Sequence, residues 1–205
     1  MALEFLYRDA KHPARVALFP GSWNPPTIAH AAIARAALNW ADEVVWIIPA
    51  TFPHKSYEGT SFEDRSRLIE LMARSHPGFS AAVSQGGLYS EIAAEARPFF
   101  GPATEIGLAL GRDAAERIAT WDYGPENPHA FFHLIRSHPL LVAARTGEYS
   151  PPEEHRDRIV RLPLQSLDDV SSTEVRRRMA EHQPWQHLVP PAIVPAIAQI
   201  YGIDF

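Results

Sequence analysis

The stretch RVALFPGSWNPPTIAH, Arg15 to His30, joins an apolar run to residues that cannot extend it. RVALF is typical of a buried strand, whereas Pro20, Gly21 and two further prolines interrupt it just before an alanine-rich segment. Because alanine is the best helix former, the pattern predicts a strand, a short loop and a helix. The loop either makes a tight turn or holds a ligand, and these residues alone leave both possibilities open.

Short apolar runs alternate with helix-like segments along the rest of the chain. We predict strands at 15–19, 43–50, 79–84, 104–111, 139–145 and 158–164, and helices at 29–41, 61–75, 89–96, 172–182 and 191–202. This alternation indicates an α/β fold with a single doubly wound, mostly parallel sheet and C-terminal helices. Because no linker or repeat interrupts the 205 residues, we expect one domain over 1–205, with loops or short helices at 122–137 and 146–156.

The composition excludes several classes of partner. A net charge of −5 argues against a nucleic-acid partner, although a small phosphorylated ligand needs only a few local donors. The chain has no cysteine, which excludes disulfides and thiolate chemistry and suits a reducing cytoplasm. We find no signal-peptide pattern, and no apolar run approaches the roughly 20 residues of a membrane span. We therefore expect a soluble, cytoplasmic protein that does not bind membranes.

The interrupted strand lies where α/β proteins bind ligands. In open α/β sheets, ligands bind beyond the carboxyl ends of the strands, where helix N-termini present N–H groups. Gly21 and Ser22 follow the first predicted strand, and the next helix directs its positive end toward them. A glycine at this position would allow a bulky anion to approach the backbone closely.

Two longer motifs strengthen the ligand-binding interpretation. GSWNPPTIAH resembles the first signature of the nucleotidyltransferase superfamily, G-[ST]-F-[DN]-P-x-[HT]-x-x-H, with Trp23 in the aromatic position and Thr27 where many bacterial members have histidine. VSSTEVRRRM, residues 170–179, resembles the I-S-S-T-x-x-R-x-R signature of the same superfamily, in which serines cap a helix and an arginine reaches the ATP phosphates. We expect Ser172 or a neighbour to be the N-cap.

Other segments resemble the nicotinate-mononucleotide adenylyltransferase branch, and together they extend the resemblance over residues 15–203. These segments are IIPATFPHK (47–55), DRSRLIELMA (64–73), LGRDAAERIATW (110–121), LLVAARTGEY (140–149) and HLVPPAIVPAIAQIYG (187–202). The resemblance implies an adenylyltransferase of NAD biosynthesis, which transfers AMP from ATP to a pyridine mononucleotide and releases pyrophosphate.

The resemblance also implies roles for individual residues. His30 would donate to the α-phosphate, assisted by Thr27 and by the amides of Gly21 and Ser22, while Lys55 and Arg176 would hold the triphosphate and the departing pyrophosphate. Asp113 would bind the nucleotide and Trp121 would stack on the base. The substrate-binding residues implied in this way are Gly21, Ser22, Trp23, Asn24, Gly111, Asp113, Trp121, Arg145, Ser171, Ser172 and Thr173.

The implied cofactor is Mg²⁺, bound through the ATP phosphates and otherwise coordinated largely by water. We expect no side chain of this chain to be a metal ligand. The implied partners are ATP and a phosphorylated small-molecule acceptor. A homo-oligomer is compatible with the sequence, which does not determine the oligomeric state.

One departure from the branch concerns the acceptor. Where its members usually carry T-x-D-T, this chain has the stretch Leu88 to Glu91, and Arg112 is an unusually large cation inside the G-x-D element. A carboxylate near Glu91 would repel the acid group of nicotinate mononucleotide, and Arg112 would compensate if it reaches across the pocket. We therefore expect nicotinate to be preferred over nicotinamide by only a small margin.

Three alternatives stay open at this point. The chain could be a nucleotidyltransferase with a different phosphorylated acceptor, or a catalytically idle nucleotide-binding protein. A metal hydrolase is the third, because His129 and His133 are spaced as i and i+4 on a predicted short helix. That pair lacks the intervening glutamate of H-E-x-x-H and a clear third ligand.

Overall fold

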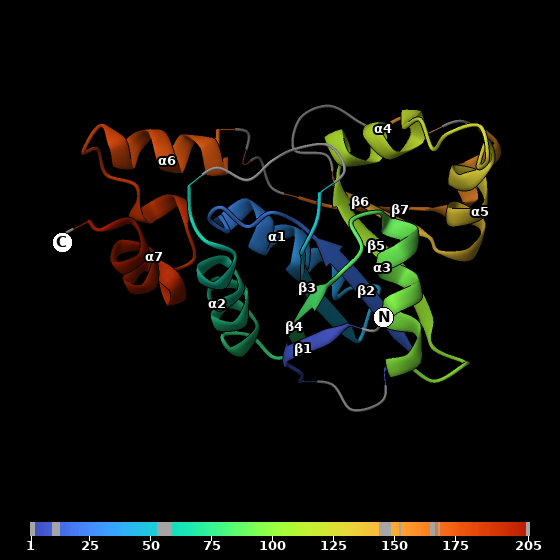
Figure 1. Cartoon of the computed structure of the whole chain (residues 1–205), viewed down its shortest axis with the longest axis horizontal. Helices are drawn as coiled ribbons and strands as arrows, with labels where there is room; N and C mark the ends of the chain where they lie inside the picture. Colours follow the sequence, from blue (N-terminus) through green and yellow to red (C-terminus); the bar gives the residue numbers. More distant parts are fainter. Residues whose placement is uncertain are drawn as a thin grey trace.

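A parallel sheet forms the centre of the computed structural model, which describes residues 3–9, 13–52, 59–143, 149–151, 153–164, 167 and 169–203. Within these residues, seven strands pair in the order β1-β4-β3-β2-β5-β6-β7 (Figure 1). The strands are β1 (Glu4–Tyr7), β2 (Arg15–Pro20), β3 (Glu43–Pro49), β4 (Phe79–Ser84), β5 (Glu105–Gly111), β6 (Leu140–Ala143) and β7 (Ile159–Leu162). Only β1 runs antiparallel to its neighbour, so the predicted α/β fold with a mostly parallel sheet is confirmed.

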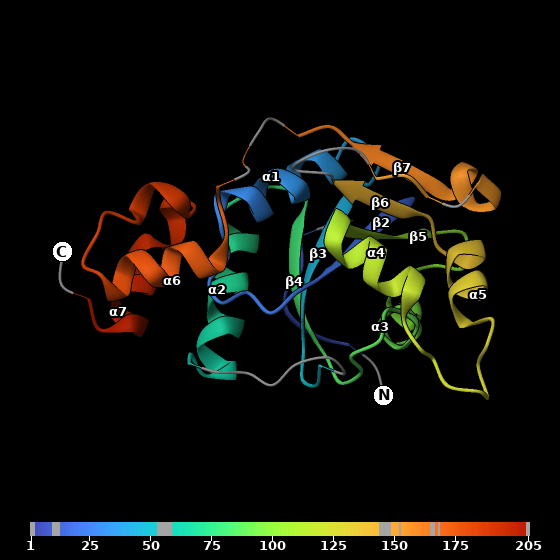
Figure 2. The ribbon, with the colours of Figure 1, turned by 90° about the horizontal axis from the view of Figure 1, so that it is seen from above.

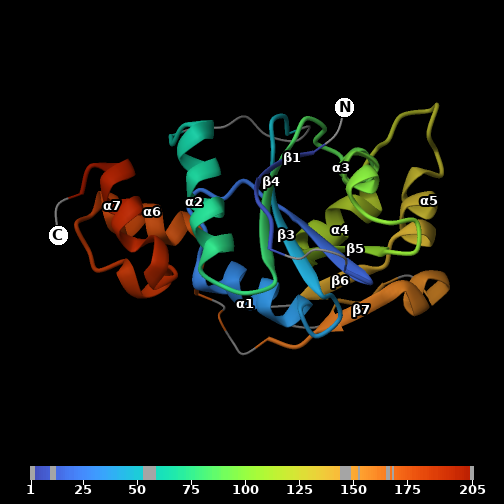
Figure 3. The same cartoon turned by 90° about the horizontal axis from the view of Figure 1, so that it is seen from below.

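Helices cover both faces of the sheet (Figures 2 and 3). One layer holds α1 (Ile28–Ala37) and α2 (Phe62–Arg74), and α6 (Ser172–Ala180) and α7 (Val194–Tyr201) join the same hydrophobic cluster. The opposite layer holds α3 (Tyr89–Ala96), α4 (Arg112–Thr120) and α5 (Ala130–Ser137). The doubly wound arrangement therefore follows the alternation of the sequence.

The central position of β2 in the sheet explains why residues 16–19 are continuously apolar. Ala17 and Phe19 pack into the layer of α1, whereas Val16 and Leu18 pack into the layer of α3 and α4. A strand that is buried on both faces has no solvent side to mark with polar residues. The strand predicted at 15–19 is confirmed, since β2 spans Arg15–Pro20.

Several boundaries differ from the prediction. The first helix ends at Ala37, and a turn at residues 38–40 replaces its expected last turn. The helix predicted at 191–202 begins as a short 3₁₀ turn at Pro191–Ile193 before α7 starts. The edge strand β1 was not predicted, because a four-residue strand that is largely half-buried leaves a weak pattern.

The chain order reverses at β2, which pairs with β3 on one side and with β5 on the other. The carboxyl ends of β2 and β5 therefore flank a topological switch point, where open α/β sheets form a ligand crevice. In the described ranges, no helix has the length and apolar character needed to cross a membrane.

Candidate active site

Two adjoining cavities open at the carboxyl ends of β2 and β5. The large cavity has a volume of about 560 Å³, and the small cavity has a volume of about 220 Å³. The residues that line both, which we call the junction, are Pro20, Gly21, Ser22, His30, Tyr89, Ala114 and Arg117. A ligand that fills one cavity therefore meets a ligand in the other at the junction.

His30 is held at the junction by the start of its own helix. Thr27 is fully buried and is the N-cap of α1, and its backbone N–H donates to Nδ1 of His30 over 3.0 Å. The Thr27 hydroxyl lies 2.9 Å from the same nitrogen. Because Nδ1 accepts this hydrogen bond, the neutral imidazole carries its proton on Nε2. His30 is therefore a hydrogen-bond donor at the junction, and Thr27 acts by positioning it.

Trp23 packs beneath His30 and determines the need for glycine at position 21. Its ring meets that of His30 edge-on with 5.3 Å between centroids, and its Nε1 donates to the Ile47 carbonyl over 2.7 Å. A Cβ on Gly21 would lie 2.6 Å from the Trp23 ring. The glycine therefore accommodates this indole, which is a different reason from the anion approach that we expected.

The amide of Gly21 is already hydrogen-bonded to strand β3. It donates to the Ile47 carbonyl over 3.0 Å, so this oxygen accepts both the Gly21 N–H and the Trp23 indole. We expected the Gly21 amide to assist a phosphate, and this geometry corrects that expectation.

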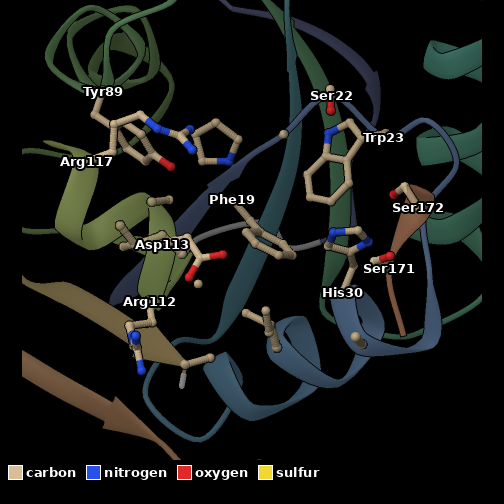
Figure 4. A pocket seen from close by; sticks show the side chains of 18 residues that line it. Phe19, Ser22, Trp23, His30, Tyr89, Arg112, Asp113, Arg117, Ser171 and Ser172 are labelled. Atoms are coloured by element: carbon tan, nitrogen blue, oxygen red, sulfur yellow. The ribbon is translucent and has the colours of Figure 1, made fainter. Parts of the chain in front are cut away.

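Residues of the second signature hold the loop at 21–30 in place. Ser171 is the N-cap of α6, which agrees with the expectation of Ser172 or a neighbour, and its hydroxyl accepts from the Glu174 N–H over 3.1 Å. The Ser172 hydroxyl donates to the Pro25 carbonyl over 2.8 Å. Both serines line the large cavity, so the N-terminus of α6 borders it beside His30 (Figure 4).

Asn24, Thr173 and Arg176 lie next to the cavities but outside their lining. The Arg176 guanidinium donates to the Asn24 carbonyl over 2.5 Å and to the Thr173 hydroxyl over 3.4 Å. The Asn24 side-chain oxygen accepts from the hydroxyls of Thr60 and Tyr201 over 2.9 and 2.6 Å. In this structure these groups brace the loop, and their contact with phosphate stays a prediction.

The opposite wall is formed by one face of α4 and by Trp121, the C-cap residue of that helix. Asp113 lines the large cavity, Arg117 lines both cavities and Trp121 lines the small one, at a spacing of four residues. Gly111 is the N-cap of α4 and also lines the large cavity. Arg112 lines the large cavity as well, with its Nε 2.9 Å from a carboxylate oxygen of Glu116.

The residues that replace T-x-D-T have two different roles: some line the small cavity, and one caps α3. Leu88 and Tyr89 line the small cavity, whereas the Glu91 carboxylate accepts from the backbone N–H groups of Gly87 and Leu88, each over 2.9 Å. Glu91 therefore caps the start of α3 and lies outside both cavity linings, so we expect its carboxylate to repel nicotinate only weakly. Burial raises the pKa of Tyr89 to about 12, so its hydroxyl stays protonated at neutral pH.

Lys55 and Arg145 lie outside the described residues. His129 is the N-cap of α5 and His133 lies on that helix, with 6.5 Å between their ring centroids. Within the described ranges, no group of three or more histidine, aspartate or glutamate side chains could hold a metal ion.

The structure brings most of the predicted site residues together. Those that line a cavity are Gly21, Ser22, Trp23, His30, Gly111, Asp113, Trp121, Ser171 and Ser172. Sequence reasoning did not single out Phe52, which lines the small cavity, or Arg117 at the junction. The spacing of Arg117, four residues after Asp113 and four before Trp121, was the available signal.

The fold is a doubly wound sheet whose switch-point crevice has His30 and the N-terminus of α6 on one side and α4 on the other. This arrangement is typical of the nucleotidyltransferase class. Residues 18–178 match the model of the cytidylyltransferase-like family. The chain therefore belongs to the cytidylyltransferase-like family, and proteins similar to it include probable nicotinate-nucleotide adenylyltransferases.

One of these relatives is the probable nicotinate-nucleotide adenylyltransferase of Salinibacter ruber, which is 30% identical over 87% of this chain and 92% of its own. The corresponding protein of Methylibium petroleiphilum is 29% identical over 93% of this chain and 91% of its own. A solved structure, the Plasmodium falciparum nicotinic acid mononucleotide adenylyltransferase complexed with NaAD, shares 17% identity with a TM-score of 0.68. It covers 93% of this chain and 98% of the solved one. That structure supports the fold.

Proposed function

We propose that this protein transfers the adenylyl group of ATP to a pyridine mononucleotide, with nicotinate mononucleotide preferred. A phosphate oxygen of the mononucleotide attacks the α-phosphorus of ATP. One P–O bond forms to give a dinucleotide, and the bond to the β-phosphate breaks to release pyrophosphate. The observation that carries this proposal is the Nε2–H of His30 at the junction of two cavities.

The chemistry requires positioning more than proton transfer. The attacking phosphate is already anionic at neutral pH, so no general base and no covalent intermediate is needed. A neutral His30 that donates from Nε2 stabilises negative charge as it develops on the α-phosphate oxygens. The N-termini of α1 and α6 add their N–H groups and positive dipole ends on the same side.

The shapes of the cavities suit the two substrates. The small cavity is lined by the aromatic rings of Phe52, Tyr89 and Trp121, which fits a flat pyridine ring. The large cavity has the larger volume and the more polar lining, with Asp113 and the two serines at the start of α6, which fits the nucleotide of ATP. Holding both substrates across the junction makes the reaction effectively intramolecular.

Mg²⁺ fits this site as an ion carried by the ATP phosphates. Asp113 is the one carboxylate among the described residues that line the large cavity, and a protein cage for Mg²⁺ would need more oxygen ligands. The ion would therefore be held by phosphate and water oxygens, where it neutralises charge on the leaving pyrophosphate. Lys55, Arg145 and Arg176 are proposed to bind phosphate groups, and Arg176 would have to leave the Asn24 carbonyl to do so.

The proposal extends to the setting of the reaction. Because ATP and the mononucleotide are intracellular metabolites, we place the protein in the cytoplasm. We treat residues 1–205 as one nucleotidyltransferase domain that acts without nucleic acid or membrane, and sedimentation velocity would test whether it forms a homo-oligomer.

A pyrophosphate-release assay with ATP tests the proposal. The acceptors to compare are nicotinate mononucleotide, nicotinamide mononucleotide, phosphopantetheine and glycerol phosphate. We expect turnover with the pyridine mononucleotides and none with the other two. Turnover only with another acceptor would leave an adenylyltransferase of different specificity, and ATP binding without any turnover would indicate an idle nucleotide-binding protein.

A further inference from the structure

The residues of α4 and its C-cap border different cavities along the length of the helix. Asp113 lines only the large cavity and Trp121 lines only the small one, whereas Arg117, between them, lines both. Arg117 therefore lies where the two cavities meet. Figure 4 shows it beside Tyr89, across the pocket from His30 and Trp23.

The junction is the place where negative charge accumulates during the proposed reaction. ATP in the large cavity and a mononucleotide in the small one bring two phosphate groups together beside His30, which also lines both cavities. Close phosphates repel each other, and their alignment requires positive charge or hydrogen-bond donors on the protein. His30 supplies a neutral donor from one side only.

The described arginines near the site differ in whether they lie at the junction, where positive charge is required. Arg112 lines only the large cavity. The Arg176 guanidinium is bound to the Asn24 carbonyl, outside the lining. Among the described residues that line both cavities, Arg117 alone carries a formal charge.

Tyr89 adds a second donor on the same side as Arg117, and it also lines both cavities. The positive charge of Arg117 favours ionisation of the phenol, but burial outweighs this effect and raises the pKa of Tyr89 to about 12. The hydroxyl therefore keeps its proton at neutral pH and can donate to an anion.

We propose that Arg117, assisted by the Tyr89 hydroxyl, binds the phosphate of the acceptor mononucleotide on the side of the junction opposite His30. The planar guanidinium can donate two parallel hydrogen bonds to one phosphate and so orient an oxygen toward the α-phosphorus. This inference rests on the proposed function and assigns to α4 the binding of the attacking group. It predicts recognition of the phosphate whatever substituent the pyridine ring carries.

The test compares Arg117→Ala with the wild type on nicotinate and nicotinamide mononucleotides. We expect kcat/KM to fall by about 10- to 100-fold with both acceptors, mainly through KM, because hydrogen bonds to charged groups are lost. The Kd for ATP, measured without acceptor, should change by less than about twofold. Arg117→Lys should recover part of the activity, and Tyr89→Phe should lose about 2- to 10-fold, as expected for one hydrogen bond.

Arg136→Ala is the matched control, because Arg136 is an exposed arginine on α5 outside both cavity linings. Its kinetics should equal those of the wild type. Arg117 is itself exposed, so the Tm of Arg117→Ala should be unchanged. If the Tm of Arg117→Ala falls, the test uses Arg117→Lys instead, through its KM for each acceptor and its Kd for ATP.

Four outcomes would overturn the inference. A loss confined to nicotinate mononucleotide would show that the guanidinium binds the acid group of the ring, and a weaker Kd for ATP would assign it to the triphosphate. Unchanged kinetics in both Arg117 variants would leave it without a role. If the wild type itself releases no pyrophosphate with either acceptor, the proposed function fails and this inference fails with it.

Discussion

The two walls of the site are built in different ways. The signature loop, residues 21–30, is held by short-range bonds, such as that between Thr27 and His30, and by a neighbouring strand through the Ile47 carbonyl. The α4 wall, which we define as Asp113, Arg117 and Trp121 together with Tyr89, is a helix face that meets the start of another helix.

This difference explains what each wall tolerates. Many residues of the signature loop contact one another, so its motif is dense and a change at one position displaces the next. The residues of the α4 wall do not hold one another in this way: Asp113 and Arg117 lie four positions apart on the helix, and Trp121 is its C-cap. We therefore expect substitutions in the loop to affect chemistry and folding, and substitutions in the α4 wall to affect the acceptor.

The largest effect should come from His30→Ala. It removes the Nε2 donor at the junction, and loss of one positioned donor to developing charge costs about 10²–10³ in kcat. Steady-state pyrophosphate release gives kcat, and calorimetry with ATP gives binding, which should fall far less. A kcat close to that of the wild type would exclude His30 from the mechanism.

The second largest effect should come from Gly21→Ala, which tests how tightly the signature loop is packed. In Gly21→Ala, the new Cβ would lie 2.6 Å from the Trp23 ring, and overpacking of this kind costs about 1–3 kcal/mol of unfolding free energy. Because Trp23 supports His30, kcat should fall as well.

Gly101→Ala is the control, since its Cβ would have its nearest contact at 3.9 Å. Chemical denaturation should show a loss for Gly21→Ala and little change for Gly101→Ala. Equal stability of the two variants would contradict the proposed contact between Gly21 and Trp23.

In the α4 wall, Trp121→Ala should weaken the acceptor alone. Stacking of a base on an aromatic ring is worth about 1–3 kcal/mol, which corresponds to about 5- to 150-fold in the KM for the mononucleotide. The affinity for ATP should stay the same, because Trp121 lines only the small cavity. Trp121→Phe retains an aromatic ring, so its KM for the mononucleotide should lie between those of the wild type and Trp121→Ala. An equal loss of affinity for ATP would show that the indole contacts ATP and not the acceptor.

The smallest effect is expected for Glu91→Gln. Its carboxylate caps α3 and lies outside both cavity linings, so the ratio of kcat/KM for nicotinate over nicotinamide mononucleotide should stay within about twofold of the wild type. A rise in this ratio would show that the carboxylate repels the acid group of nicotinate after all.

The sheet and the family were predictable because their signals are local or periodic. The predicted strand at 79–84 and helix at 89–96 match β4 and α3 residue for residue. The family was recognised from motifs whose order along the chain is preserved, and the match over residues 18–178 confirms it. The roles of individual site residues, including Lys55 and Arg145 outside the described ranges, stay predictions.

The errors occurred where a group has two possible partners. Sequence reasoning assigned Gly21 to an approaching anion and Glu91 to the acceptor pocket, but a nearby indole and two backbone amides engage them instead. A sequence shows which groups can donate or accept, whereas packing decides which partner each one meets.

By itself, the sequence determined the six strands β2 to β7 and the helix after the first loop, since apolar runs and alanine-rich segments depend on residues only a few positions apart. Only the tertiary structure decided that Arg176 binds the Asn24 carbonyl across 152 positions, and that Tyr89 and Arg117 share a junction with His30. Those contacts depend on how helices from both faces of the sheet meet at its carboxyl edge. That geometry comes from the packing of the whole core, and no short stretch of the chain encodes it.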